Sequence, residues 1–131
     1  TILNQVMNNF VSGNNETHKS LIDIKKNAIK IANILEGDSL TEFGLLLNKI
    51  FVNQKKLHTS ITTPDIDKIF SIALKQTGAG GKIMGAGGGG FVYLYCRNNK
   101  IKQIKTKLEK ENYKTFQIKF VNDGPIIKIL K

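Results

Sequence analysis

Residues 78 to 91 read Gly-Ala-Gly-Gly-Lys-Ile-Met-Gly-Ala-Gly-Gly-Gly-Gly-Phe, and this stretch holds eight of the 12 glycines in the chain. Ordering a glycine costs roughly 0.5–1 kcal/mol more than ordering an alanine in regular structure, so a run this dense needs a physical reason. The usual reasons are positive φ angles or a close approach of the backbone to another group. Consecutive backbone N–H groups in such a loop can also surround an anion. The run therefore predicts a tight loop, with an anionic ligand as one candidate for what it approaches.

Two familiar nucleotide motifs match the run only in part. Gly85, Gly87 and Gly90 fit the spacing GxGxxG, but a dinucleotide-binding fold needs that loop to open a helix. Here the loop opens the apolar, β-forming stretch 91–96, which indicates a strand. A P-loop needs Ser or Thr after its Gly-Lys pair, whereas Ile follows Lys82. Both interpretations are therefore rejected.

A third match is the glycine loop of protein kinases, GxGxxGxV, which Val92 completes and which does lie in a hairpin. The chain has no HRD or DFG sequence, and its expected helices precede the loop, so this interpretation also fails. A glycine-rich hairpin without any ligand stays open as an alternative.

The 77 residues before the run have the periodicity of helices. We expect helices over residues 2–11, 17–35 and 39–57, and a fourth that begins at Pro64. Gly37 is expected to end the second helix and Asp38 to cap the third. The expected buried positions are Leu21, Ile24, Ala28, Ile31, Ala32 and Leu35 in the second helix, Leu40, Phe43, Leu46, Leu47, Ile50 and Phe51 in the third, and Ile66, Ile69, Phe70, Ala73 and Leu74 in the fourth.

The start of the fourth helix carries the strongest local signal in the chain. Thr63 is expected as its N-cap, Pro64 as its first residue, and Asp65 and Asp67 as acidic residues of the first turn. These two carboxylates are therefore interpreted as parts of a helix start.

The part after residue 77 changes to a mixed pattern. We expect a strand over 91–96, a helix over 100–111 capped by Asn99, an alternating strand over 113–121, a turn at 122–125 and a last strand over 126–130. With a strand before the glycine loop, the order is helices followed by β–loop–β–α–β–β. The sequence therefore predicts an α+β fold, with an antiparallel, ferredoxin-like sheet covered by helices on one face. It predicts a single domain over residues 1–131, with a helical part (1–77) and a glycine-loop part (78–131).

Charge and cysteine content limit the classes of function. The net charge is +10, yet nearly all the basic residues are Lys, they are spread along the chain, and Arg97 is the one Arg. Base readout depends strongly on Arg, so nucleic acid is an unlikely partner, although a basic nucleic-acid-binding or regulatory module stays open. Cys96 is the one cysteine, which excludes a disulfide framework and fits the cytoplasm. No apolar run approaches the roughly 18 residues of a membrane span.

The glycine run resembles the third sequence motif of the GHMP kinases, named for galactokinase, homoserine kinase, mevalonate kinase and phosphomevalonate kinase. The resemblance covers residues 17–131. Within it, the segment Lys55-Lys56-Leu57 with Ser60, then Thr63 to Asp67, is similar to the subgroup that acts on D-glycero-D-manno-heptose 7-phosphate. That subgroup often has a Trp in the preceding helix, where this chain has Phe51. The matching motif positions are Gly78, Ala79, Gly81, Lys82, Ile83, Gly85, Ala86, Gly87, Gly89 and Gly90.

The resemblance implies a C-terminal part of an ATP-dependent sugar or sugar-phosphate kinase. It implies that the nucleotide loop, the catalytic residues and the Mg²⁺ ligands lie in an N-terminal domain that is the partner of this chain. We therefore expect no catalytic or metal-binding residue here, and no kinase activity from these 131 residues alone. The residues expected to bind the cofactor are Gly85, Ala86, Gly87, Gly88, Gly89 and Gly90, with Lys82 as a candidate for binding the phosphorylated substrate.

Four other side chains were weighed for a role in binding. Lys55 and Lys56 could meet a sugar phosphate, although an exposed helix surface is the simpler interpretation. His18 and His58 have no Cys or acidic partner at metal-ligand spacing, so both are interpreted as structural.

Overall fold

A computed structural model describes residues 1–37, 39–121 and 124 of the chain. It contains α1 (Ile2–Val11), α2 (Asn15–Leu35), α3 (Phe43–Leu57), a short 3₁₀ helix η1 (Thr59–Ile61), α4 (Pro64–Ala73), β1 (Gly80–Ile83), β2 (Val92–Tyr95) and α5 (Asn98–Lys110). β1 and β2 form an antiparallel hairpin in which Gly80 pairs with Tyr95 and Ile83 with Val92. The predicted α+β class is confirmed.

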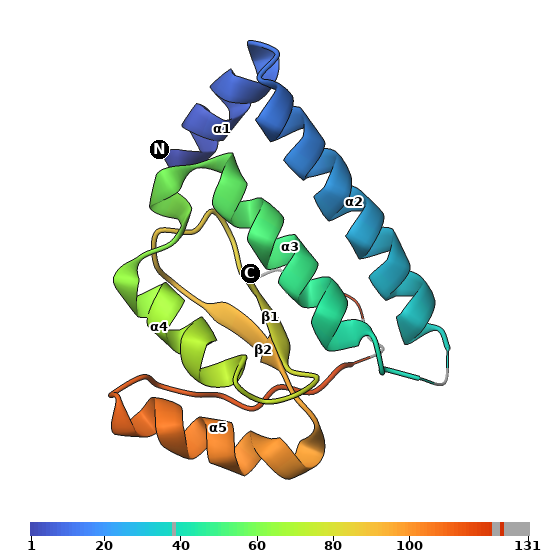
Figure 1. Cartoon of the computed structure of the whole chain (residues 1–131), viewed down its shortest axis with the longest axis vertical. Helices are drawn as coiled ribbons and strands as arrows, with labels where there is room; N and C mark the ends of the chain where they lie inside the picture. Colours follow the sequence, from blue (N-terminus) through green and yellow to red (C-terminus); the bar gives the residue numbers. More distant parts are fainter. Residues whose placement is uncertain (38, 122–123, 125–131) are drawn as a thin grey trace, which may run out of the picture.

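The long helix α3 is the centre of the arrangement. Figure 1 shows α2 running along one side of α3 and the hairpin and α4 lying on the other, with α5 below them. α1 meets α2 at a corner at the opposite end of the molecule from α5. No helix in the described part of the chain is long and apolar enough to cross a membrane.

The contact between α3 and β1 is made by backbone against backbone. A Cβ atom added to Gly80 would lie 1.9 Å from the carbonyl oxygen of Gly44 in α3. A Cβ atom added to Gly44 would lie 2.4 Å from the carbonyl oxygen of Gly78. Real Cβ atoms do not approach other atoms this closely, so the helix and strand can pack at this distance only because both positions are glycine.

Two side-chain amides of α3 hydrogen-bond to the edge of β1 that does not face β2. Asn48 accepts from the N–H of Gly81 at 3.0 Å and donates to the carbonyl of Ala79 at 3.2 Å. Gln54 accepts from the N–H of Ile83 at 2.9 Å and donates to its carbonyl at 3.0 Å. Backbone groups at a strand edge need partners when they are buried. The two amides supply partners that a third strand would otherwise provide.

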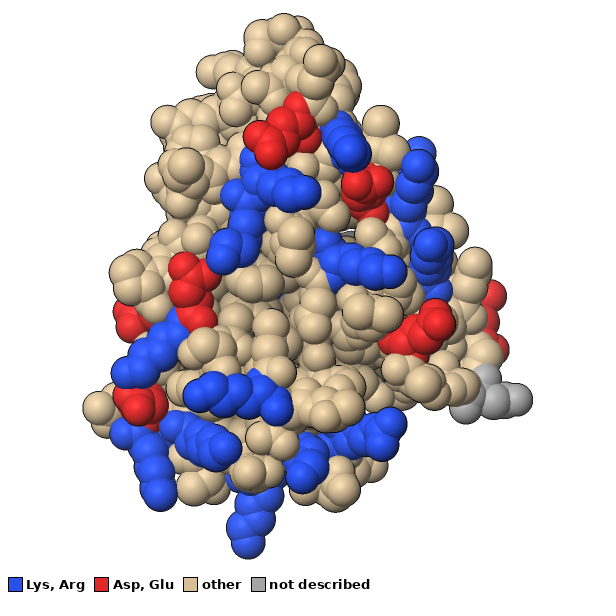
Figure 2. All heavy atoms as spheres, in the orientation of Figure 1, with Lys and Arg blue, Asp and Glu red and all other residues tan. Residues whose placement is uncertain are grey.

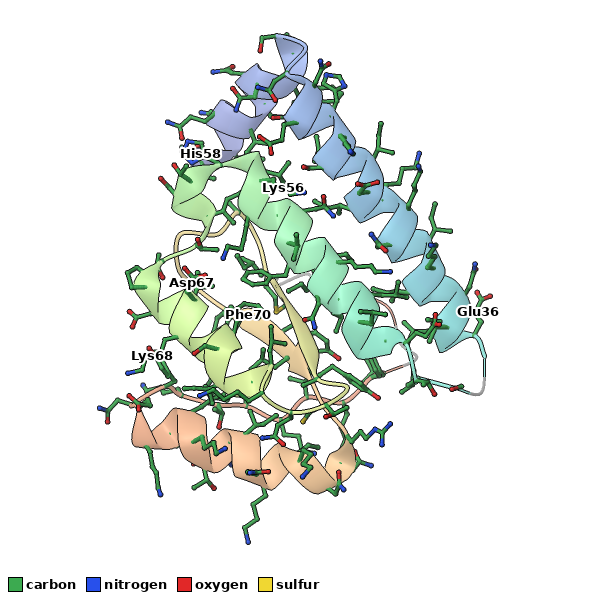
Figure 3. All side chains as sticks on the ribbon, in the orientation of Figure 1. Glu36, Lys56, His58, Asp67, Lys68 and Phe70 are labelled. Carbon is green, nitrogen blue, oxygen red and sulfur yellow. The ribbon has the colours of Figure 1, made fainter. Side chains whose placement is uncertain are left out.

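Two apolar clusters hold the elements together. In the first, the rings of Phe51 and Phe70 stack with centroids 3.7 Å apart, which joins α3 to α4, and Figure 3 shows Phe70 directed from α4 towards α3. Its members are Val6, Phe51, Ile61, Ile66, Phe70 and Ile83. The second cluster joins α4 to α5 through Ala73, Ile104 and Leu108, and Cys96 packs against it as a small apolar side chain.

The expected buried face is confirmed for the third helix and only partly for the second, where Leu21, Ile24 and Ile31 are half-buried. In α3, Leu40 lies before the helix and is 39% exposed, while the other five expected residues are buried. In α4, Ile66, Phe70 and Ala73 are buried, and Leu74 is exposed. In α2, the buried residues are Thr17, Ser20 and Asn27, whereas Ala28, Ala32 and Leu35 are exposed. Small hydroxyl side chains let α2 approach α3 closely, and the Asn27 amide donates to Asp23 of its own helix at 2.7 Å.

Several helix boundaries differ from the expectation. α3 begins at Phe43 and not at residue 39, and its expected cap, Asp38, lies outside the described residues. α2 ends at Leu35 with Glu36 as its C-cap, so Gly37 follows the helix end as expected, although its φ angle is not positive. α5 begins at Asn98 with Arg97 at the N-cap, so Asn99 lies inside the helix. By contrast, Thr63 caps α4 as predicted, accepting from the N–H of Ile66 at 3.2 Å.

The predicted strand over residues 113–121 is wrong, because the structure has no regular element there. Phe116, Ile118 and Phe120, the apolar side of the alternation, are all exposed. Alternating apolar and polar residues indicate that one side of a segment could be buried. A β-strand also needs a neighbouring strand with which to form backbone hydrogen bonds. The turn expected at 122–125 and the strand at 126–130 lie outside the described residues, apart from Gly124.

We predict that Gly44→Ala destabilises the chain although alanine is the better helix former. Alanine gains about 1 kcal/mol of helix propensity, but its Cβ atom would have to displace the backbone at Gly78. Overpacking of this kind costs about 1–3 kcal/mol, so urea unfolding should show a net loss of stability. Gly37→Ala is the matched control, since its Cβ atom would meet its nearest neighbours at 3.6 and 3.7 Å. Equal stabilities of the two variants would contradict the close contact.

Candidate functional site

The glycine loop connects β1 to β2 and is closed at its base by a hydrogen bond. The N–H of Met84 donates to the carbonyl of Phe91 at 3.0 Å. Between them the backbone has positive φ angles at every glycine, with 76° at Gly85, 87° at Gly87, 77° at Gly88, 153° at Gly89 and 80° at Gly90. Residues with a Cβ atom rarely adopt these angles, which explains the composition of the loop.

Two glycines of the loop dock against η1 and α1. The N–H of Gly88 donates to the carbonyl of Ile61 at 2.8 Å. A Cβ atom at Gly87 would lie 2.7 Å from that same oxygen, and one at Gly88 would lie 2.9 Å from Cδ1 of Ile2. Gly87 and Gly88 are therefore needed for packing as well as for the φ angle.

The other glycines of the loop face open space. A Cβ atom at Gly85, Gly89 or Gly90 would have no neighbour within 4 Å in the part of the chain that the structure describes. Among the described residues, no acceptor lies within hydrogen-bond distance of the N–H groups of these three residues, of Ala86 or of Gly87. Neighbouring backbone N–H groups in a turn conformation can form a concave, positively polarised surface. This part of the loop can therefore receive an anion such as phosphate.

Lys82 lies on β1, close to the base of the loop. Its Nζ donates to the carbonyl of Ile83 at 2.7 Å, so the ammonium is held along the strand. The side chain is half-buried, and this burial lowers the pKa of Lys82 from its ordinary value of 10.5. The ammonium thus lies near the loop, and its role in substrate binding remains a prediction.

The other candidate side chains make contacts within the chain. Lys55 pairs with Asp67 of α4 at 3.1 Å and lies 5.4 Å from the centroid of the Phe51 ring. His18 stacks on Phe10 with ring centroids 4.3 Å apart. His58 accepts from the N–H of Ser60 at 3.1 Å through Nδ1, next to the loop-binding η1. Figure 3 shows His58 at the end of α3, beyond Lys56.

Sequence reasoning missed three groups that hold the loop: the Gln54 amide, the Ile61 carbonyl and the His58 ring. Gln54 contacts Ile83 across 29 positions of sequence, and a polar residue in a helix gives no sign of such a partner. The signal that was present is the short spacing His58-x-Ser60, which permits a local side-chain cap.

The family of the chain follows from comparison with known proteins. The family model described as GHMP kinases C terminal matches residues 30–115, which include α3, η1, α4, the hairpin with its glycine loop, and α5. The chain belongs to the GHMP kinase family. The resemblance stated from the glycine run is thereby confirmed.

The similar proteins are kinases with different named substrates. The chain is 37% identical over 81 residues to a mevalonate kinase of Methanocaldococcus jannaschii, covering 62% of this chain and 25% of that protein. It is 23% identical over 112 residues to a D-glycero-alpha-D-manno-heptose 7-phosphate kinase of Campylobacter jejuni, covering 86% and 33%. It is 39% identical over 82 residues to a galactokinase of Saccharomyces cerevisiae, covering 60% and 15%. The chain thus spans a third or less of the length of these relatives. No solved structure matches the chain.

We predict a pH-dependent stability difference between the protein and its Lys82→Met variant. Because the pKa of Lys82 is lowered by folding, the folded protein binds fewer protons than the unfolded chain as the pH approaches 10.5. The free energy of unfolding of the protein should therefore rise, relative to that of the variant, as pH increases towards that value. Urea unfolding of both proteins from pH 7 upwards measures this, and a constant or falling difference would contradict a buried ammonium.

Proposed function

We propose that this chain is the C-terminal domain of an ATP-dependent kinase that phosphorylates a sugar or a sugar phosphate. The observation that carries the proposal is the set of backbone N–H groups at Gly85, Ala86, Gly87, Gly89 and Gly90, which have no hydrogen-bond partner among the described residues in a loop whose glycines all have positive φ angles. Membership of the GHMP kinase family supports phosphoryl transfer as the reaction. A cytoplasmic location belongs to the proposal and is supported by the single thiol of the chain.

The residues present fit a phosphate group in the open part of the loop. Gly85, Gly89 and Gly90 leave room beside the backbone, and their N–H groups together with that of Ala86 would donate to phosphate oxygens. ATP, when bound, supplies the phosphoryl group. The loop would act by positioning that group and by offsetting its negative charge, which are the main contributions of proteins to phosphoryl transfer. The hydrogen bond from Gly88 to Ile61 would keep the donors in place.

Magnesium has no comparable place in the described part of the chain. No three His, Cys, Asp or Glu side chains gather there in a way that could hold a metal ion. We propose that an N-terminal domain binds Mg²⁺ and contains the catalytic residues. Residues 1–77 would then be the helical support and residues 78–131 the part that contains the glycine loop.

The charge of the chain favours phosphorylated ligands. The net charge of +10 attracts anions over distances of about the Debye length, 8 Å at physiological ionic strength. Figure 2 shows Lys and Arg side chains spread over one face of the molecule, along α5 and α2. Lys82 is the lysine that lies in the strand leading to the loop. A sugar phosphate, as named for the Campylobacter relative, is therefore the preferred substrate class.

The proposal is tested by assaying phosphoryl transfer from ATP to galactose, heptose 7-phosphate and mevalonate. The 131-residue chain alone should show no turnover, because it supplies one wall of the site. The longer polypeptide that carries it should phosphorylate a sugar or sugar phosphate. Turnover by the chain alone would contradict the proposal that it supplies one wall of the site. Transfer to mevalonate only would contradict a sugar or sugar phosphate as the substrate.

A matched pair of glycine variants tests the role of the loop. Gly85 and Gly13 have nearly equal φ angles, 76° and 78°, and a Cβ atom at either position would meet nothing within 4 Å. Alanine at each should therefore cost a similar stability, about 1–2 kcal/mol. In the kinase-active polypeptide, Gly85→Ala should lower kcat/KM at least tenfold, whereas Gly13→Ala, at the corner between α1 and α2, should leave it unchanged. Equal kcat/KM values for Gly85→Ala and Gly13→Ala would contradict the proposal that the loop is part of the active site.

A further inference from the structure

His58 lies where α3 ends and η1 begins. It is the C-cap residue of α3 and the N-cap residue of η1, with extended backbone angles. Its Nδ1 accepts a hydrogen bond from the N–H of Ser60 at 3.1 Å. An Nδ1 that accepts carries no proton, so the proton of the neutral ring is on Nε2. The geometry therefore defines the tautomer that the folded protein uses.

The turn that His58 caps is the one that holds the glycine loop. η1 ends at Ile61, whose carbonyl accepts from the N–H of Gly88 at 2.8 Å. The side chain of Ile61 is 4% exposed in the first apolar cluster, which fixes one end of the turn. At the other end the His58 carbonyl accepts from the N–H of Ile61 at 3.2 Å, and the imidazole adds the cap on the N–H of Ser60. Two hydrogen bonds thus connect the ring to the loop. The N–H of Ser60 donates to the His58 ring, and the N–H of Gly88 donates to the carbonyl of Ile61, the residue after Ser60.

We propose that His58 is a positioning residue that holds the glycine loop while its ring is neutral and releases it when the ring is protonated. Protonation places a hydrogen on Nδ1, which changes this nitrogen from an acceptor into a donor. The N–H of Ser60 then loses its partner, as in the removal of an N-cap. With η1 less ordered, the Ile61 carbonyl no longer fixes Gly88.

The helices that precede and follow His58 and η1 in the chain, α3 and α4, carry titratable side chains. The last turn of α3 contains Lys55 and Lys56. α4 contributes the carboxylates of Asp65 and Asp67, and the latter is already paired with Lys55 at 3.1 Å. α1, η1 and the loop residues 84–91 contain no titratable side chain. No direct carboxylate contact to the His58 ring is present among the described residues, so the switch depends on the ring and its cap.

The test measures amide hydrogen exchange by NMR, without nucleotide or substrate. The protection factors of Ser60 and Gly88 are compared between pH 7.5 and 5.5, and the ring signal of His58 reports its own titration. Both protection factors should fall roughly fivefold in step with that titration, the effect of losing a typical cap. The contribution of His58 to catalysis rests on the proposed function. The hydrogen-bond connection itself is measured independently of it.

Three variants separate a specific role from a general loss of structure. His58→Asn, whose side-chain oxygen is a good N-cap acceptor, should keep Gly88 protected at both pH values. His58→Ala should lower the protection of Gly88 roughly fivefold at both pH values. His18→Gln changes the other histidine of the chain and should retain the response of the unmodified protein. Constant protection of Gly88 through the titration of His58 would overturn the proposal, as would a His58→Asn variant that behaves like His58→Ala or a response lost in His18→Gln.

Discussion

The contact between the backbones of Gly44 and Gly80 is the constraint on which the rest of the structure depends. A Cβ atom at Gly80 would lie 1.9 Å from the Gly44 carbonyl oxygen, so this helix and this strand meet at a distance that no other residue pair permits. The short distance brings the amides of Asn48 and Gln54 within reach of the strand edge. β1 is thereby held by α3 on one edge and by β2 on the other, although the described sheet has only two strands.

The position of the glycine loop follows from this arrangement. Gln54 binds both backbone groups of Ile83, one residue before the loop begins, and η1 binds Gly88 near its middle. The loop is therefore fixed at its base and at its centre, while the N–H groups of Gly85, Gly89 and Gly90 stay open. Donors that are already in place need not be ordered when a ligand binds, which reduces the entropy lost on binding.

Local features of the sequence predicted the helices and the loop, but not the contacts between them. The start of α4 could be predicted because Thr63 and Pro64 act within one turn. The buried face of α2 could not be predicted in the same way. A periodicity argument expects apolar residues to be buried, whereas Thr17 and Ser20 are polar and are buried because they are small. The alternation over 113–121 indicated a strand, yet alternation does not provide a pairing partner. The amides of Asn48 and Gln54 act across 29 to 33 positions, beyond any local pattern.

The glycine motif of this family therefore combines two separate physical requirements. Gly87 has a positive φ angle and the Ile61 carbonyl also occupies the place of its side chain, whereas Gly85 needs to be glycine for its φ angle alone. A sequence match to the motif does not distinguish the role of Gly87 from that of Gly85. The structure divides them into glycines that dock the loop and glycines that present free donors. Since the N–H of Gly88 is bonded to Ile61 of η1, the backbone joins η1 directly to the neighbouring donors at Gly87 and Gly89.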